Sequence, residues 1–336
     1  MDANTFSSPS TLGGNREDLR NVLTILEPED TPFTSMAKKG PSPKATFTEV
    51  LGDTLRKPRK SGTKEGADAG KGGNKASNRA RFGTYVHRVQ DEFGVTDVQE
   101  LVSERGGVAA ISNEYGDAKA KCVREVKRDI ESVCCSDQEH QGGSDAEMQT
   151  RGAFTWLSPT AQALNPVPSQ FLCLTGNVLS GVGTTVPLFT EAQLNAILKS
   201  MKTVYGGKKE FDMVAGNNVV ETIDNFTRTN TSTTNARYQV HEMADEHEIT
   251  LMVQVFDSSF GRVNVIPTEF NKISSAGVGD ANTALILNMD LWELMFLDAL
   301  HSADLPELGG GPQGYVKAMF ANTCLSPKGN GKIYNT

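Results

Sequence analysis

The stretch HEMADEHE, residues 241–248, combines histidines and carboxylates in a way that could bind a metal. A zinc-binding helix presents two histidines four residues apart on one face. His241 and His247 are six residues apart, which separates them by about 240° around a helix. We therefore interpret the carboxylates of this stretch as surface or structural acids and expect no metal site here.

The glycine-rich stretch GADAGKGG, residues 66–73, has some likeness to a phosphate-binding loop. That loop requires four residues between two glycines, and Ser or Thr directly after the lysine. Here only three residues separate Gly66 from Gly70, and Gly72 follows Lys71. The stretch therefore predicts a flexible, solvated tip rather than a nucleotide site.

The remaining candidate nucleophiles form no catalytic pattern. The cysteines are odd in number, two of them are adjacent and none forms a CxxC motif, which indicates reduced, buried thiols. There is no GxSxG motif, and we expect the five histidines to lie in polar surroundings. We therefore predict no enzymatic activity, no metal and no cofactor. These residues are Cys122, Cys134, Cys135, Cys173 and Cys324, and His87, His140, His241, His247 and His301.

A basic tract from Arg56 to Phe82 stands out because the whole chain carries a formal net charge of -8. The tract contains too little apolar surface to fold alone. Three interpretations remain open: phosphate contacts to nucleic acid, although interleaved aromatic residues for base stacking are missing; a solvated linker; or a loop on the acidic surface of an adjacent copy, which we favour. The basic residues are Arg56, Lys57, Arg59, Lys60, Lys64, Lys71, Lys75, Arg79 and Arg81.

Extended segments flank this tract on both sides. Residues 45–55 place Phe47 and Val50 among threonines, and residues 82–95 resume strand character. Two extended arms joined by a long polar tip predict a protruding hairpin. Because an isolated hairpin is only marginally stable in water, we expect this one to need a neighbour to lie on.

The strongest helical pattern spans residues 111–136. Apolar residues recur there at steps of three and four, and the length predicts a rod of roughly 39 Å. The apolar positions are Tyr115, Ala118, Cys122, Val126, Ile130 and Val133.

Weaker patterns predict the other elements. Thr31 and Pro32 begin a short helix that Gly40 ends, and a capping box of Thr190 and Gln193 begins another that Gly206 ends. The remaining expected elements are a helix over 15–26, an amphipathic piece over 146–158, loops over 158–189, a strand over 211–216, a helix over 217–226, a hairpin over 249–265, a buried strand or strand-to-helix passage over 284–299, and two strands around residues 327–331. No apolar run approaches the ~20 residues that span a bilayer, and the N-terminus does not resemble a signal peptide.

Four further stretches are informative: GNREDLRNVLTILEPEDTPFTSMAKKG, TEVLGDTL, REVKRDIESVCCS and TRGAFTWLS. They resemble the major capsid protein of tailed bacteriophages, which has the α+β Hong Kong 97 (HK-97) capsid fold. The DTPF motif followed by a strand, and the KRDIE helix, contribute most to the resemblance. It covers residues 14–157, and over 158–336 it depends on the order of elements.

The resemblance implies five regions. They are an N-terminal arm (1–42), an extended E-loop hairpin (43–99), a peripheral domain (100–157) with a spine helix (111–136), an axial domain (158–290), and C-terminal strands that return to the body (291–336).

The resemblance also implies a structural function. Copies would form pentamers and hexamers of an icosahedral phage head, enclosing double-stranded DNA without sequence-specific binding. The basic tract would be the E-loop tip, and its nine cations would contact a neighbouring subunit. The expected partners are other copies, a portal, and any scaffolding or decoration protein, with no membrane. Since the sequence begins with Met1, we expect any scaffold to be a separate protein.

The expected location is the virion capsid, after assembly in the host cytoplasm. Two alternatives remain open at this point. One is an encapsulin-like, non-viral compartment shell, which would differ in its cargo. The other is a soluble hydrolase in which the basic tract is a mobile lid.

Overall fold

A computed structural model of the 336-residue chain provides the structure. It describes residues 30–55, 58, 60–62, 64–66, 78–106, 113–143, 147–228, 255–274, 277–306 and 309–335. The helix expected over 15–26 and the HEMADEHE stretch lie outside these residues, as does most of the GADAGKGG stretch. Among the described helices, none has the length and apolar composition that crossing a membrane requires.

The chain forms two compact units. The described residues of the smaller unit fall within 92–123 and 302–316, and those of the larger unit fall within 30–91, 124–301 and 317–335. The smaller unit includes helix α2 (Asp97–Gly106) and the first part of helix α3 (Glu114–Cys134). Within this unit the Tyr115 hydroxyl donates to Asp304 Oδ1 at 2.7 Å.

The larger unit contains a six-stranded mixed sheet with strand order β5-β12-β9-β6-β8-β7. Strand β6 pairs in parallel with β8 and antiparallel with β9. The described part of the hairpin predicted over 249–265 is the antiparallel pair β7–β8, and residues 249–254 lie outside the described residues. The strands are β5 (Val178–Ser180), β6 (Lys209–Ala215), β7 (Val255–Asp257), β8 (Gly261–Pro267), β9 (Ala284–Leu287) and β12 (Gly331–Tyr334).

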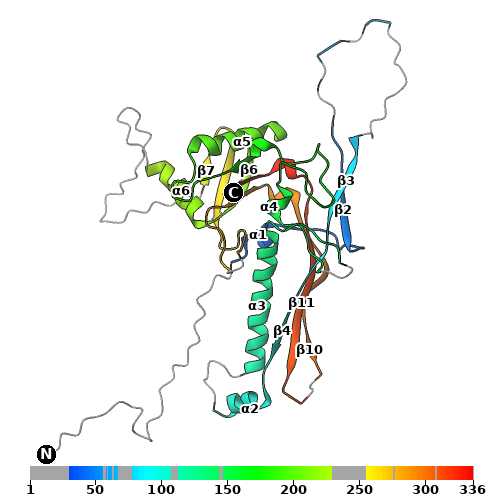
Figure 1. The fold of residues 1–336 in the computed structure, drawn as a ribbon, viewed down its shortest axis with the longest axis vertical. Helices are drawn as coiled ribbons and strands as arrows, with labels where there is room; N and C mark the ends of the chain where they lie inside the picture. The colour runs from blue at the N-terminus through cyan, green and yellow to red at the C-terminus, as the bar shows by residue number, and fades with distance from the viewer. Residues whose placement is uncertain are drawn as a thin grey trace, which may run out of the picture. The chain divides into compact units, whose positions relative to one another are not determined.

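Helices α5 (Glu191–Tyr205) and α6 (Asn217–Arg228) pack their apolar faces into one core with strands of this sheet (Figure 1). The capping box predicted for α5 is present, since Thr190 Oγ1 accepts from the Gln193 N–H and the Gln193 side chain accepts from the Thr190 N–H. Gly206 ends α5 with a φ of 72°, a left-handed conformation that glycine adopts without strain. Local sequence thus defines this helix at both ends.

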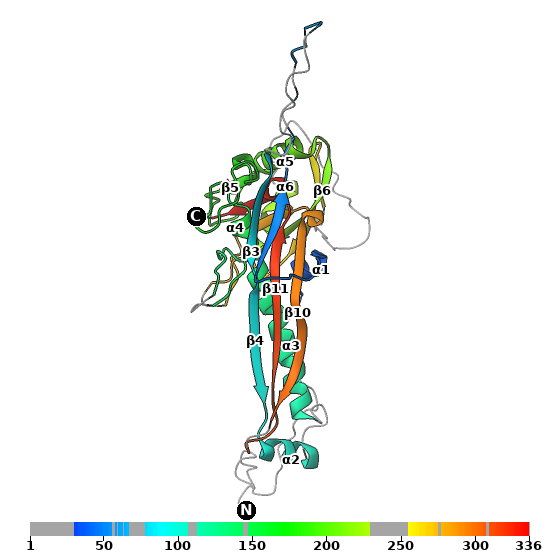
Figure 2. The same ribbon diagram turned by 90° about the vertical axis from the view of Figure 1, so that its right-hand side faces the viewer.

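A second sheet has the strand order β1-β10-β11-β4, and a third contains only β2 and β3. Figure 2 shows β4, β11 and β10 as neighbouring strands. The strands are β1 (Lys38–Lys39), β2 (Phe47–Gly52), β3 (Ala80–Tyr85), β4 (His87–Gly94), β10 (Trp292–Leu305) and β11 (Gln313–Cys324). The stretch expected over 284–299 is strand on both sides of a 3-10 turn at Met289–Leu291. The two strands expected in the tail are β11 and β12, and they belong to different sheets.

The long helix α3 confirms the strongest prediction. Cys122, Val126 and Ile130 of its predicted apolar face are buried. One buried residue was not anticipated: Glu131 has no exposed surface although it carries a carboxyl group.

Two helical predictions have wrong bounds, and the stretch 158–189, expected to be loop, contains β5, which pairs with β12. The arm helix α1 (Pro32–Met36) ends before Gly40, because Lys38 and Lys39 extend as β1 and pair in parallel with β10. The amphipathic piece over 146–158 is helical only in the single turn α4 (Ala153–Trp156), because Gln149 pairs instead with Gln141 in a β-bridge.

Candidate functional site

The predicted hairpin is present as strands β2 and β3. They pair antiparallel from Phe47 opposite Tyr85 to Gly52 opposite Ala80. Leu51 on β2 is 62% exposed and Leu55, just beyond the strand, is 99% exposed. The hairpin therefore presents apolar surface that the described part of its own chain does not cover.

Two of the nine predicted tip cations are paired within the hairpin itself. Arg79 Nε lies 3.0 Å from Asp53 Oδ2, and Arg81 Nη1 lies 3.6 Å from Glu49 Oε2. Such exposed ion pairs contribute about 0–1 kcal/mol each. Lys60 and Lys64 are exposed, and the other five (Arg56, Lys57, Arg59, Lys71 and Lys75) lie outside the described residues. Contact of these cations with another subunit stays a prediction.

The base of the hairpin is attached to the body first by an aromatic cluster. Phe82 of β3 is 4% exposed, and its ring lies 5.4 Å from Phe171 and 6.1 Å from Trp156. Burial of such a side chain stabilises the fold by about 1.5–3 kcal/mol. Phe82 therefore ties β3 to the loop that contains Phe171 and to the α4 turn.

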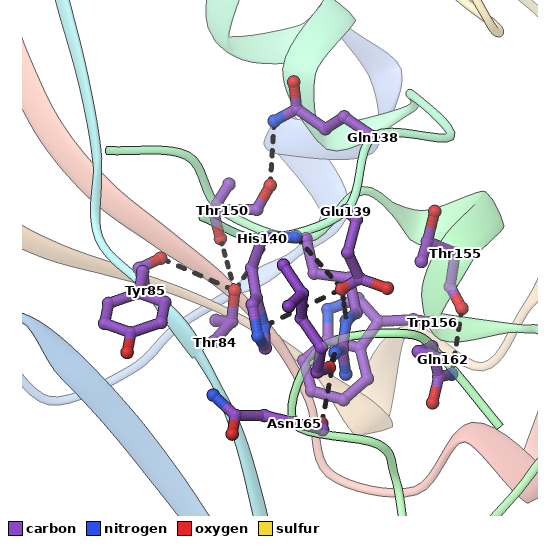
Figure 3. Close-up of polar contacts among 12 residues, drawn as sticks. Thr84, Tyr85, Gln138, Glu139, His140, Thr150, Thr155, Trp156, Gln162 and Asn165 are labelled. Carbon is purple, nitrogen blue, oxygen red and sulfur yellow. Dashed lines mark hydrogen bonds and ion pairs between the residues drawn. The ribbon is translucent and has the colours of Figure 1, made fainter. Parts of the chain in front are cut away.

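A buried polar cluster lies next to these rings (Figure 3). Thr84 of β3 and Thr150 have no exposed surface, and their hydroxyl oxygens are 3.1 Å apart. The Arg151 N–H donates to Thr84 Oγ1 at 2.8 Å, and the Asn322 N–H of β11 donates to Thr150 Oγ1 at 3.0 Å. These bonds connect the hairpin, the loop after α3 and the second sheet.

The side chain of Arg151 holds this cluster together. Its Nε donates to Glu139 Oε1 at 2.6 Å, its Nη2 donates to the Leu164 carbonyl at 2.8 Å, and its guanidinium lies 4.7 Å from the Trp156 ring centroid. Burial lowers the pKa of Arg151, and the ion pair with Glu139 opposes that shift. Because the guanidinium is fully buried, removal of either partner would leave an uncompensated charge.

His140 completes the base of the hairpin and contradicts the expectation of polar surroundings. It is 1% exposed, and its ring meets Phe47 of β2 and Tyr85 of β3 edge-on, with centroids 5.9 and 5.4 Å away. Burial, followed by the charge of Arg151, lowers the pKa of His140 to about 4. His140 is therefore neutral at pH 7 and packs against the hairpin as an uncharged ring.

His87, at the start of β4, contradicts the same expectation. Its ring lies 5.5 Å from the Phe320 ring of β11. Burial lowers the pKa of His87 to about 4, with a smaller opposing effect of Glu147. Both histidines next to the hairpin are packing residues.

The arm is attached to α3 by a carboxylate. Glu131 accepts hydrogen bonds from the backbone N–H groups of Phe33 and Thr34 at 2.7 and 2.8 Å. The predicted cap residue Thr31 precedes α1, but its side chain makes no capping bond. The buried carboxylate satisfies the start of α1 instead, which explains its place in the core.

The predicted buried thiols are confirmed, since all five cysteines are buried and none of them forms a disulfide. Burial raises the pKa of the Cys173 thiol to about 12 and raises the pKa values of Cys134 and Cys135 well above their ordinary value. Such thiols are protonated and unreactive at neutral pH. Within the described ranges, no group of three or more His, Cys, Asp or Glu side chains is placed to hold a metal ion.

Sequence reasoning did not identify the cluster around Arg151. Its members are far apart in the chain, and the single local signal was an arginine directly before the apolar stretch GAFTWL. That stretch contributed to the resemblance to capsid proteins, but its spacing did not predict a buried ion pair.

One known protein family matches nearly the whole chain. A family model described as "SU10 major capsid protein" matches residues 3–336. No curated protein matches the sequence.

Solved capsid structures are similar in fold. The chain matches the cyanophage A-1(L) capsid asymmetric unit with a TM-score of 0.65 and 13% identity, covering 95% of this chain and 96% of that one. It matches the Mycobacterium phage Adephagia structure with a TM-score of 0.60 and 10% identity, covering 98% of both. It matches the capsid of an empty GTA particle with a TM-score of 0.57 and 10% identity, covering 95% and 94%.

The architecture is thus the predicted HK-97 capsid fold, and the chain belongs to the SU10 major capsid protein family, the structural proteins of phage virion heads.

Proposed function

We propose that this protein assembles with copies of itself into pentamers and hexamers that close into an icosahedral head around double-stranded DNA. The observation that supports this most directly is the β2–β3 hairpin. Its base is fixed by Phe82, Thr84 and the Arg151 cluster, while Leu51 and Leu55 are exposed. A rigidly attached element with apolar surface open to solvent is suited to contact another molecule.

The partner of the hairpin is a neighbouring copy in this proposal. The five regions keep the boundaries given above: the arm, the E-loop, the peripheral domain, the axial domain and the C-terminal strands. The nine tip cations contact acidic surface of that copy, and Arg79 and Arg81 contribute least because their charges are already balanced. Stable contacts of this kind bury about 1,000 Å² or more each.

The protein has a structural rather than a catalytic function in this proposal. Its family consists of capsid proteins. The buried thiols are protonated, and His87 and His140 are packed among other side chains. Portal, scaffolding and decoration proteins would be further partners, and assembly would take place in the host cytoplasm.

The proposal is tested by electron microscopy of the purified protein. We expect closed particles tens of nanometres across, with pentameric and hexameric capsomers. Deletion of residues 57–77 leaves β2 and β3 intact and should give a folded subunit that assembles poorly. Normal shells from this deletion would exclude a function of the tip in assembly, and a persistently monomeric full-length protein would exclude the proposal as a whole.

DNA content separates a phage head from a non-viral compartment. Particles isolated from an infection should contain double-stranded DNA that resists nuclease. Particles that contain only protein cargo would favour the compartment.

A further inference from the structure

A polar pocket of about 340 Å³ lies in the larger unit. Its lining includes Lys272 and Lys332, together with Ser158, Thr160 and Tyr334. The capsid function proposed above does not use any of these side chains. The pocket is notable because two ammonium groups converge on it.

Lys332 of β12 is a buried cation without a carboxylate partner. It is 8% exposed, and its Nζ donates to the Phe154 carbonyl at 2.7 Å. An ammonium group has three donors, so two remain available. Within the described residues, no carboxylate oxygen lies within 4.0 Å of this Nζ. Burial of an ammonium group with so few partners is costly.

Lys272 brings a second positive charge to the same place. Its Nζ lies 5.9 Å from the centroid of the Tyr334 ring, and Lys332 Nζ lies 4.7 Å from that centroid. The backbone of Lys272 is left-handed, with a φ of 44°, which is a strained conformation for a residue with a side chain. Lys272 thus reaches the Tyr334 ring from a strained backbone position.

The two acidic residues of the lining already have partners. Asp137 Oδ2 lies 3.4 Å from Lys272 Nζ, and Glu139 accepts from Arg151. The charges of Lys272 and Arg151 are therefore balanced, and that of Lys332 is not. The hydroxyl oxygens of Ser158 and Thr160 are 3.0 Å apart. Since only one of these hydroxyls donates to the other, the second hydrogen is available to a ligand.

From this arrangement we propose that the pocket binds a small oxyanion, either a phosphate group or a carboxylate, through Lys332, Lys272 and the Ser158–Thr160 hydroxyls. The anion neutralises Lys332 and accepts the donors that the protein leaves unused. Charge-assisted hydrogen bonds of this kind are roughly twice as strong as neutral ones.

The protonation of Lys332 gives the binding a defined pH dependence. The pKa of Lys332 is lowered to about 8, chiefly by burial and also by the charge of Lys272, and Cys173 and Asp137 oppose the shift. The Cys173 thiol is itself neutral at this pH, because its pKa is raised to about 12. Since the anion binds the ammonium form, its affinity should fall as the pH rises from 7 to 9.

The test is calorimetric titration of the full-length, unassembled subunit with inorganic phosphate and, separately, with acetate. We expect saturable binding of at least one anion at pH 7, weakened at least tenfold in Lys332→Met and several-fold in Lys272→Met. Lys199→Met, which changes an exposed lysine of α5, should leave the affinity unchanged. Tighter binding of phosphate identifies a phosphate group as the ligand class, and tighter binding of acetate identifies a carboxylate.

A second measurement on the unmodified chain avoids dependence on how the variants fold. Acetylation of Lys332 by acetic anhydride is followed by mass spectrometry with and without the anion. The anion should slow acetylation of Lys332 severalfold and leave Lys199 unaffected. Absence of both saturable binding and protection, or equal affinity in a folded Lys332→Met variant, would overturn the proposal.

Discussion

The backbone N–H of Phe33 donates to Glu131 Oε1 at 2.7 Å, across 98 residues of sequence. Phe33 is fully buried, and its ring meets Trp292 of β10 edge-on at 5.4 Å. The hydrogen bond thus joins the arm to α3, and the ring contact joins it to the second sheet. A single buried carboxylate connects elements that local sequence alone could not bring together.

Replacement of Glu131 by glutamine should destabilise the subunit by about 1–3 kcal/mol. The amide has only one oxygen, so its NH₂ group would face one of the two backbone N–H groups that Glu131 now accepts. The free energy of unfolding of the unassembled subunit, from urea denaturation, measures the effect. Glu221→Gln, at an exposed position on α6, is the matched control and should change it by less than about 0.5 kcal/mol. Equal stability of the two variants would contradict the bridging function of Glu131.

Replacement of Arg151 by methionine should destabilise the subunit by about 3–5 kcal/mol, because it leaves the Glu139 carboxylate without its cationic partner. Hydrogen exchange should also accelerate in β3, since the cluster fixes Thr84. Arg79→Met removes an exposed ion pair of the same hairpin and should cost about 1 kcal/mol or less. Similar losses for both variants would show that the Arg151 cluster does not anchor the hairpin.

Gly83→Ala should disrupt the hairpin. A Cβ at this position would lie 2.0 Å from the Thr48 carbonyl oxygen, which belongs to the backbone of the paired strand and cannot move aside. We expect a loss of about 1–3 kcal/mol together with poor assembly, observed by denaturation and electron microscopy. Gly62→Ala, where the added carbon meets no atom within 4 Å, should assemble normally. A stable, assembling Gly83→Ala protein would be incompatible with the pairing of β2 and β3.

Acidification should weaken the packing of His140 and His87 next to the β2–β3 hairpin. The pKa values of His140 and His87 are lowered from 6.5 to about 4 in the folded chain, so the unfolded chain binds more protons between these values. Stability is therefore fully present above pH 6.5 and falls as the pH decreases toward 4. Each histidine should contribute about 1–3 kcal/mol to this loss. Unfolding free energies measured from pH 7 to 4 should show a smaller decrease in His140→Leu than in the parent protein, and an unchanged slope would exclude His140 as a source.

Several elements could be predicted from the sequence because their signals are local. Thr190, Gln193 and Gly206 define both ends of α5 within a few residues of each helix terminus. The apolar spacing of α3 predicts its buried stripe, and the strand patterns on both sides of the basic tract predict β2 and β3. Backbone preference and hydrophobic period act over a few residues, so they can be read without knowledge of the fold.

The same local rules were insufficient at Lys38 and Lys39. Their charge and the glycine that follows suggested the end of a helix, but a partner strand was available and they extend along β10. Likewise, residues near Gln149 carry an amphipathic helical pattern, yet Gln149 exchanges both backbone hydrogen bonds with Gln141. Tertiary partners overrode weak local preference in both places.

Residue patterns and motifs were sufficient to predict the capsid class, the order of the main elements and the burial of the cysteines. The burial of particular polar residues, among them Glu131, Arg151 and His140, became apparent only in the folded chain. The physical reason is that a polar side chain enters the core only where partners satisfy it or rings enclose it. Glu131 and its partner Phe33 are 98 residues apart, and Arg151 and the Asn322 side chain that donates to its carbonyl are 171 residues apart. Residue type and spacing give no information about partners at that separation, which the fold alone brings together.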